Sequence, residues 1–362
     1  MPAKKKTETT EDIKEEVKVE PEDMGEELDN KKKETMVDIF APMVSTVAKG
    51  LEGKVILVYG TNSLGKTRQA TRMKKPFYLP FEQGLNAIAG VPYCPINKWS
   101  DFIKINKQLT DPATVKKARE LYSTIIFDEI EAASNYCQEF ICQKYRVASI
   151  GEGNRGYGLW KEYETEFWKQ INKLTSAGYC VYFIAHAQEK DGFITPKADK
   201  RALSPILNLA DLTVYVRSNG VDEKGRVIKS SGYLAETDEF FARSRFDYLP
   251  STEIPEFTAE NLEKLVIEAI ELQEEAEGIK AVTYEEQKKQ RQSVTRSYDD
   301  LMGDLQVAGE NMAENGYLEE LQDIVANHLG EGKKASDLRK GQEQVIEALL
   351  YDIEEFARAK GI

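Results

Sequence analysis

The chain has 362 residues, 41% of them hydrophobic, so it can bury a sizeable core and is long enough for two or three domains. Its net charge of −13 is uneven: residues 1–37 carry −4, residues 38–250 carry +5 and residues 251–362 carry −14. The basic central part permits a polyanionic ligand, although such an excess of Lys and Arg is also ordinary surface chemistry. No apolar h-region and no 18-residue apolar run occurs, which argues against a membrane partner and predicts a cytoplasmic protein.

The composition also limits the metal chemistry. The four cysteines are scattered without C-x-x-C spacing, so the sequence predicts neither a disulfide framework nor a zinc site. With only His186 and His328 in the chain, it argues against a His-based metal cluster. The metal ion that we expect is Mg²⁺, bound together with a nucleotide.

Residues 1–37 consist mainly of Lys, Glu, Asp and Thr, with almost none of the apolar residues that could offset the entropy of ordering them. We therefore expect a disordered charged tail; a partner-binding tail is the alternative, because KKK occurs twice. The apolar density rises from Ile39, and residues 38–250 are predicted to form the main domain.

The apolar run from Val55 to Tyr59 leads into GTNSLGKT at residues 60–67, which has the spacing G-x-x-x-x-G-K-[ST] of a P-loop. Its glycines let backbone N–H groups converge on a phosphate chain, Lys66 supplies a charge for the β- and γ-phosphates, and Thr67 offers a hydroxyl to Mg²⁺. A helix from Lys66 to about Met73 would add the positive end of its dipole. The motif predicts an ATP site, with a Gly-rich turn as the alternative; its residues are Gly60, Thr61, Asn62, Ser63, Leu64, Gly65, Lys66, Thr67 and Arg68.

Two further predicted strands deliver carboxylates to the same edge of a sheet. The strand 77–81 is followed by Glu82, and the strand 124–127 is followed by Asp128 and Glu129. Asp128 has the Walker B position and would orient the water shell of Mg²⁺, while Glu82 and Glu129 are alternative general bases for an attacking water. Otherwise Glu82 caps a loop, and Glu129 is an ordinary residue at a helix N-terminus.

A helix over 130–148 is expected next, followed by a glycine-rich, mobile loop at 149–158 that carries Arg155 and Tyr157. The apolar positions in 159–174 repeat at intervals of three and four, which predicts an amphipathic helix with a core-facing stripe. A strand over 179–185 then leads into His186 and a polar loop. That loop holds Phe193 and four basic residues, Lys190, Lys197, Lys200 and Arg201.

The domain is predicted to finish with a strand over 211–217 and paired segments at 232–237 and 239–250. Arg243 and Arg245 are two residues apart, so they project from the same face of a strand. They could reach one target together, or they could form surface ion pairs with Asp238 or Asp247.

The order of these parts resembles the RecA-like core, and most closely the AAA/RecA-like P-loop ATPases of phages, which include single-strand annealing proteins. The resemblance covers about residues 50–250 and rests on GTNSLGKT, FEQGL, TIIFDEI, GYGLWKEY…FWKQINKL…GYCVYFIAH and ADLTVYV…YLAET…ARSRFDYLP. It implies an α/β fold with a mostly parallel central sheet. It also implies Mg²⁺-dependent ATP hydrolysis on single-stranded DNA, in phage-type recombination or replication in a host cytoplasm.

The resemblance assigns roles to residues at the nucleotide. The catalytic glutamate that follows the second strand corresponds to Glu82, which favours it over Glu129. The γ-phosphate sensor corresponds to His186, where RecA-like recombinases usually have glutamine. Arg243 and Arg245 correspond to a pair that reaches the nucleotide of a neighbouring subunit, which implies a homo-oligomer with nucleotide at its subunit interfaces.

Two loops in such proteins bind single-stranded DNA, and they correspond to residues 149–158 and 188–204. A solvated basic loop without a ligand is the alternative for the second. The DNA-binding residues implied are Arg155, Tyr157, Lys190, Phe193, Lys197, Lys200 and Arg201.

Residues 251–362 are acidic and show no strand pattern, so we expect an all-helical extension with helices near 258–277, 283–313, 316–328 and 336–359. Thr283 and Glu286 predict a capping box. The extension would recruit a single-strand-binding or recombination partner, or it would serve only for oligomerisation or capping. Two other functions therefore fit the sequence: a nucleotide-gated scaffold that acts through these helices, and a DNA-translocating motor or helicase.

Overall fold

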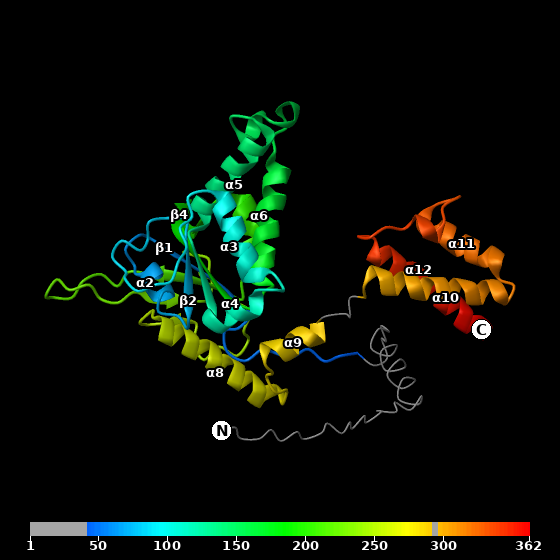
Figure 1. Cartoon of the computed structure of the whole chain (residues 1–362). Coiled ribbons are helices and arrows are strands. Elements are labelled where there is room, and N and C mark those ends of the chain that lie inside the picture. Colours follow the sequence, from blue (N-terminus) through cyan, green and yellow to red (C-terminus); the bar gives the residue numbers. More distant parts are fainter. Residues whose placement is uncertain (1–41, 292–295) are drawn as a thin grey trace, which may run out of the picture. The chain divides into compact units, whose positions relative to one another are not determined.

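The computed structural model describes residues 42–291 and 296–362 and divides the chain into two compact units, which Figure 1 shows. The core unit spans Val44–Lys289, and the other unit contains the described residues between Gln290 and Ile362. The tail predicted for residues 1–37 lies outside the described residues.

The described part of the core unit contains a nine-stranded sheet with the order β2-β3-β4-β1-β6-β7-β9, in which β5 pairs with β4 and β8 pairs with β6. The central strands run parallel, and the strands added at the end of the domain are antiparallel. The predicted α/β class with a mostly parallel sheet is confirmed. The parallel strands are β1 (Val55–Gly60), β2 (Pro76–Pro80), β3 (Thr124–Asp128), β4 (Cys180–Lys190) and β6 (Leu212–Arg217). The others are β5 (Phe193–Lys197), β7 (Ser231–Tyr233), β8 (Arg243–Ser244) and β9 (Glu253–Ile254).

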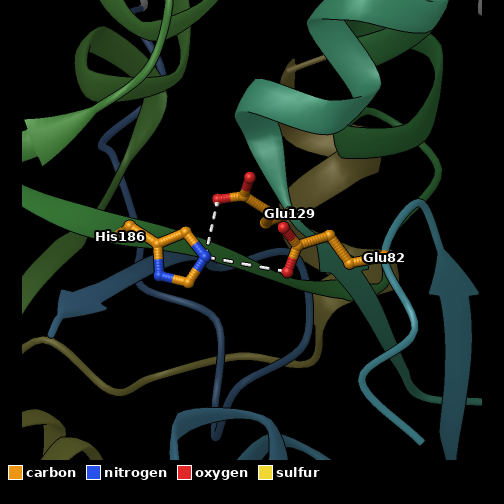
Figure 2. Close-up of side chains that lie close together, drawn as sticks. All are labelled: Glu82, Glu129 and His186. Atoms are coloured by element: carbon orange, nitrogen blue, oxygen red, sulfur yellow. Dashed lines mark ion pairs between the residues drawn. The ribbon is translucent and has the colours of Figure 1, made fainter. Parts of the chain in front are cut away.

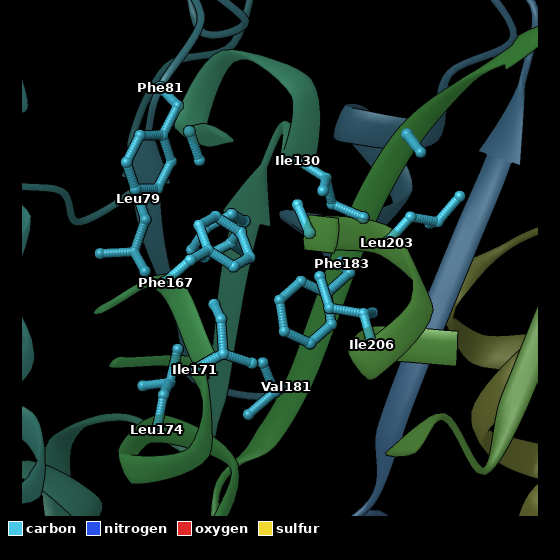
Figure 3. Packing of buried hydrophobic residues seen from close by; sticks show 14 of the residues in the cluster. Leu79, Phe81, Ile130, Phe167, Ile171, Leu174, Val181, Phe183, Leu203 and Ile206 are labelled. Carbon is cyan, nitrogen blue, oxygen red and sulfur yellow. The ribbon is translucent and has the colours of Figure 1, made fainter. Parts of the chain in front are cut away.

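Both faces of the sheet are buried, which explains why its central strands are continuous apolar runs. In β1, Leu57 and Tyr59 belong to one core cluster, while Ile56 and Val58 belong to another, because successive side chains point to opposite faces. Figure 3 shows part of the first cluster, in which helical residues such as Phe167 pack against the strands. The helices that contribute to it are α3 (Trp99–Thr110), α5 (Ile130–Tyr145), α6 (Trp160–Thr175) and α7 (Lys200–Leu209).

The opposite face is covered by α2 (Lys66–Ala70) and α8 (Ala259–Glu277). The domain boundary predicted at residue 250 is therefore wrong for α8, whose Leu262 and Val266 are fully buried in the same cluster as Ile56. Acidic residues dominate the composition of α8, but its apolar residues recur along one stripe and bury that stripe on the sheet. The chain after α8 also returns to the core, because Val282 exchanges backbone hydrogen bonds with Val47 and Lys49.

The helix predicted over 283–313 consists of two helices, α9 (Tyr284–Arg291) and α10 (Tyr298–Glu314). The predicted capping box is confirmed, because Thr283 and Glu286 each accept a backbone hydrogen bond from the other. Ser297 caps the backbone N–H of Asp300 and begins a new helix. With α11 (Leu318–Leu329) and α12 (Glu343–Lys360), α10 forms a helical bundle with its own apolar core. The last helix starts later than predicted, after a 3₁₀ turn at Ala335–Asp337.

Several other local predictions change. The helix after the P-loop ends at Ala70, short of Met73, and α3 and α4 (Val115–Leu121) are helices additional to those predicted. The predicted loop 149–158 contains two short 3₁₀ turns, at Ile150–Glu152 and Asn154–Gly156. The predicted polar loop 188–204 is largely regular structure: β4 continues to Lys190 and forms an antiparallel hairpin with β5, and α7 follows.

The four cysteines are free thiols, and Cys137 and Cys180 are buried as small apolar side chains. In the part of the chain that the structure describes, every helix is too short or too polar to cross a lipid bilayer.

The packing of α8 predicts that Leu262→Ala destabilises the core unit by about 2–5 kcal/mol, because the substitution leaves a cavity against the sheet. The free energy of unfolding would be measured in guanidinium chloride by tryptophan fluorescence, since all three tryptophans, Trp99, Trp160 and Trp168, lie in this unit. Leu272→Ala is the matched control on the same helix, because Leu272 is 40% exposed and should cost less than about 1 kcal/mol. Equal losses in the two variants would contradict the assignment of α8 to the core.

Candidate nucleotide site

The predicted site residues meet at the carboxyl edge of the parallel sheet. Gly60 at the end of β1 is in register with His186 of β4, and Asp128 at the end of β3 is in register with Pro80 of β2. Glu129 directly follows β3, and Glu82 lies two residues beyond the end of β2. Parallel pairing alone therefore brings together groups that are more than 120 residues apart in the chain.

The P-loop leaves β1 through a turn that needs two of its glycines. A Cβ atom on Gly60 would collide with the backbone oxygen of Val216 on β6, and Gly65 has a φ of 82°, in the left-handed region that favours glycine. The Lys66 ammonium is buried and donates hydrogen bonds to the carbonyl oxygens of Gly60, at 3.0 Å, and Thr61, at 2.7 Å. Burial lowers the pKa of Lys66, and nearby carboxylates partly oppose that shift.

Asp128, at the Walker B position, is hydrogen-bonded to the P-loop. Its Oδ2 atom accepts hydrogen bonds from Thr67 Oγ1, at 2.7 Å, and from the hydroxyl of Tyr78, at 2.9 Å. Burial raises the pKa of Asp128, although these two hydrogen bonds favour the ionised form. The oxygen atoms of Thr67 and Asp128 are the hard ligands that Mg²⁺ prefers, so these two residues fit the predicted metal role.

Tyr78 and Gly84 also belong to this arrangement, although no sequence motif predicted a role for either residue. Tyr78 is fully buried in β2, where a hydroxyl in an otherwise apolar strand was the available signal. A Cβ atom on Gly84 would collide with the Tyr78 hydroxyl and crowd Asp128, so the glycine in FEQGL allows the chain to pass close to the Walker B carboxylate.

Glu82, Glu129 and His186 form a second group beside this pair, and Figure 2 shows their side chains pointing toward one another. His186 Nε2 lies 3.6 Å from Glu82 Oε2 and 3.7 Å from Glu129 Oε2. One ligand atom from each residue lies within 4.8 Å of the others. The sequence had argued against a His-based metal cluster because histidine is rare in the chain, but the fold surrounds His186 with carboxylates instead.

The two candidate bases differ in environment. The Glu82 side chain is 43% exposed, whereas that of Glu129 is 3% exposed. Burial, followed by repulsion from Glu82, Glu131 and Asp128, raises the pKa of Glu129 to about 8. At neutral pH Glu129 therefore holds its proton most of the time.

The residues predicted to bind DNA on the second segment lie on the β4–β5 hairpin and at the start of α7. The hairpin is anchored at the nucleotide site, because Lys197 is in register with His186. Lys197 also forms an ion pair with Glu131, with 2.9 Å between Nζ and Oε2. The predicted residues on these elements are Lys190, Phe193, Lys197, Lys200 and Arg201.

A cation–π contact connects the second predicted DNA segment to the helix that follows the first segment. The Arg201 guanidinium lies over the ring of Trp160, 4.4 Å from its centroid, and Trp160 starts the helix that follows the loop 149–158. Within that loop Arg155 is exposed and Tyr157 is 83% exposed. The contact thus connects the start of α7 to the start of α6, and the Tyr157 ring is open to solvent.

Arg243 and Arg245 do not lie at the nucleotide site of their own chain. Arg243 begins β8 and Arg245 directly follows it, and β8 pairs with the first residues of β6, at the end of the sheet opposite the P-loop. Arg243 donates to the carbonyl oxygen of Leu207, Arg245 donates to that of Asn208, and Arg245 forms an ion pair with Asp211 at 3.7 Å. Both arginines therefore satisfy carbonyl groups at the end of α7.

The sheet, the P-loop and the paired Thr67 and Asp128 define a P-loop ATPase of the AAA type. The chain belongs to the family described as AAA domain, whose model matches residues 52–246. It is also 56% identical over 320 residues to the SPbeta prophage-derived uncharacterized protein YorG of Bacillus subtilis (strain 168), an alignment that covers 88% of this chain and 98% of that protein. Nucleotide binding is thus a property of its family.

The buried Glu129 predicts that the protein loses stability as the pH rises. The folded state keeps a proton up to about pH 8, whereas the unfolded chain releases it near pH 4.5, so stability present below about pH 4.5 is lost as the pH rises to 8. Glu129→Gln keeps a neutral side chain and should flatten this loss, becoming more stable than the wild type at pH 8. The midpoint of thermal unfolding, measured from pH 5.5 to 8.5 in EDTA, would give the pH dependence of stability for each protein. Glu139→Gln, an exposed change on the same helix, should follow the wild type, and parallel curves for all three proteins would refute the assignment.

Proposed function

We propose that this protein is an Mg²⁺-dependent ATPase that acts on single-stranded DNA in phage-type recombination or replication. The observation that carries the ATPase part is the 2.7 Å hydrogen bond between Thr67 and Asp128, which joins the P-loop to the Walker B strand. Membership of the AAA domain family supports it. The similarity to a prophage-derived protein supports the phage setting.

In this proposal the P-loop N–H groups and the Lys66 ammonium bind the β- and γ-phosphates of ATP. To reach a phosphate, the ammonium exchanges its hydrogen bonds to the carbonyl groups of Gly60 and Thr61 for stronger, charge-assisted ones. Thr67 and Asp128 would hold Mg²⁺, which supplies positive charge to the transferring phosphoryl group. Their side chains need little rearrangement, because the two oxygen atoms already lie together.

Glu82 is the better general base of the two candidates. A carboxyl group that already holds a proton cannot accept one from an attacking water, and the raised pKa of Glu129 leaves it mostly protonated at neutral pH. Glu82 faces solvent beside the same site and lies 3.6 Å from His186. His186 would sense the γ-phosphate from its place opposite Gly60 of the P-loop.

The ATPase proposal predicts different losses for two substitutions. Lys66→Ala should lower both ATP affinity and turnover, by about 2–4 kcal/mol of transition-state stabilisation, whereas Glu82→Gln should keep ATP binding and lose hydrolysis. Phosphate release and binding of a fluorescent ATP analogue would be measured, with and without single-stranded DNA. Glu189→Gln, an exposed change on the hairpin, serves as the control. Hydrolysis at the wild-type rate by Lys66→Ala protein would rule the assignment out.

The DNA part of the proposal is supported by the hairpin and the loop that leave the nucleotide site. The hairpin carries Lys190 beyond the edge of the sheet and is in register with His186, so a change at the γ-phosphate can reach it along one strand. The exposed Tyr157 ring in the other segment suits base stacking. The Arg201–Trp160 contact ties the two segments into one surface.

Reversing two exposed charges tests this surface. Lys190→Glu combined with Lys200→Glu should weaken binding to an oligothymidine and reduce the slope of log K against log salt by about 0.7 for each lost phosphate contact. Fluorescence anisotropy at several salt concentrations would measure both. Lys197 is left intact because a glutamate there would repel Glu131.

Lys116→Glu combined with Lys117→Glu is the matched control, since both residues are exposed on α4. The same loss of slope in the control and the test variant would show only a general effect of net charge. No change in the test variant would remove the hairpin from the proposed DNA surface.

A nucleotide-gated scaffold is the second candidate function. It is favoured by one observation: the helices α10, α11 and α12 form a separate compact unit with its own apolar core, around residues such as Leu301 and Ile346. Such a unit can recruit another protein without taking part in hydrolysis. An ATPase rate that single-stranded DNA leaves unchanged would favour this candidate.

A further inference from the structure

The group formed by Glu82, Glu129 and His186 brings three elements to one point. Glu82 follows β2, Glu129 immediately precedes α5, and His186 lies on β4 (Figure 2). One imidazole nitrogen and two carboxylate oxygens face one another within 4.8 Å.

Hydrogen bonding does not account for this arrangement. The two distances from His186 Nε2, 3.6 and 3.7 Å, exceed the 2.7–3.2 Å of an N–H···O hydrogen bond. Glu129 is buried, with only 3% of its surface exposed. Its Oε2 atom has no hydrogen-bond partner among the described residues. A buried carboxyl oxygen without a hydrogen-bond partner is costly, so a ligand that satisfies it is expected. That atom points at the imidazole ring.

The spacing fits a bound metal ion. An ion held tetrahedrally at about 2.1 Å from nitrogen and oxygen ligands places those ligands roughly 3.4 Å apart. The two separations from His186 Nε2 differ from that by only a few tenths of an ångström, and the third ligand–ligand separation is within 4.8 Å. A mixed set of one imidazole and two carboxylates suits Mn²⁺, Fe²⁺ or Zn²⁺, whereas Mg²⁺ prefers oxygen ligands alone.

We propose that Glu82, Glu129 and His186 form a binding site for a divalent transition-metal ion, separate from the Mg²⁺ position at Thr67 and Asp128. The two positions use different side chains, so each can be removed without deleting a ligand of the other. The cations nearest the group are already engaged: Lys66 binds P-loop carbonyl groups and Lys197 pairs with Glu131. A divalent ion would balance the carboxylates that these lysines do not reach. The site goes beyond ATP hydrolysis, because it needs no nucleotide.

Electron paramagnetic resonance with Mn²⁺ tests the site in the full chain without nucleotide. A large excess of Mg²⁺ suppresses binding to other acidic groups. The wild type should bind one Mn²⁺ with hyperfine coupling to an imidazole nitrogen, measured by a pulsed experiment. His186→Ala should lose that coupling and weaken Mn²⁺ binding at least about tenfold.

His328→Ala is the matched control, because His328 is the other histidine of the chain and pairs with Asp352 in the second unit, at 2.6 Å. It should keep both the affinity and the nitrogen coupling. Asp128→Asn removes the proposed Mg²⁺ ligand and should also keep the coupling, which separates failure of this site from failure of the ATPase proposal. If His186→Ala protein does not fold, as judged by circular dichroism, His186→Gln replaces it.

Two results would overturn the proposal. One is Mn²⁺ bound to the wild type without nitrogen coupling, or not bound at all under excess Mg²⁺. The other is nitrogen coupling that survives in the His186 variant and disappears in His328→Ala.

Discussion

The buried carboxylate of Asp128 is the constraint on which the site depends. Burial disfavours its charge, and the hydroxyl groups of Thr67 and Tyr78 compensate by donating to the same oxygen. One donor comes from the P-loop and the other from β2, so a single atom holds three parts of the sheet edge in place. The close passage of Gly84 depends on the same arrangement.

The parallel register explains why chemistry collects at this edge. Strands β1, β2 and β3 end here and β4 passes through with His186, so polar residues at or just beyond these strand ends lie side by side. Carboxylates that lie this close repel one another. This repulsion, together with burial, raises the pKa of Glu129, whereas Glu82 remains exposed to solvent.

Elements outside the sheet edge differ in how they are attached to it. The β4–β5 hairpin continues the strand that carries His186, so it is joined directly to the site. The arginines of β8 are attached to the far edge, where they satisfy the end of α7. Position relative to the strand ends, more than residue type, separates the basic groups beside the candidate site from those that hold the end of α7.

The sequence by itself determined what depends on neighbours along the chain. It predicted the P-loop, the strand before Asp128, the amphipathic α6 and the Thr283–Glu286 cap, because local spacing and apolar runs encode them. It could not show that α8 covers the sheet, since an acidic composition hides a narrow apolar stripe. Only the tertiary structure decided that Tyr78 donates to Asp128, that Glu129 is buried against His186, and which helix end Arg243 meets. Those contacts join residues far apart in sequence, and their energies arise from burial and register, which no local pattern records.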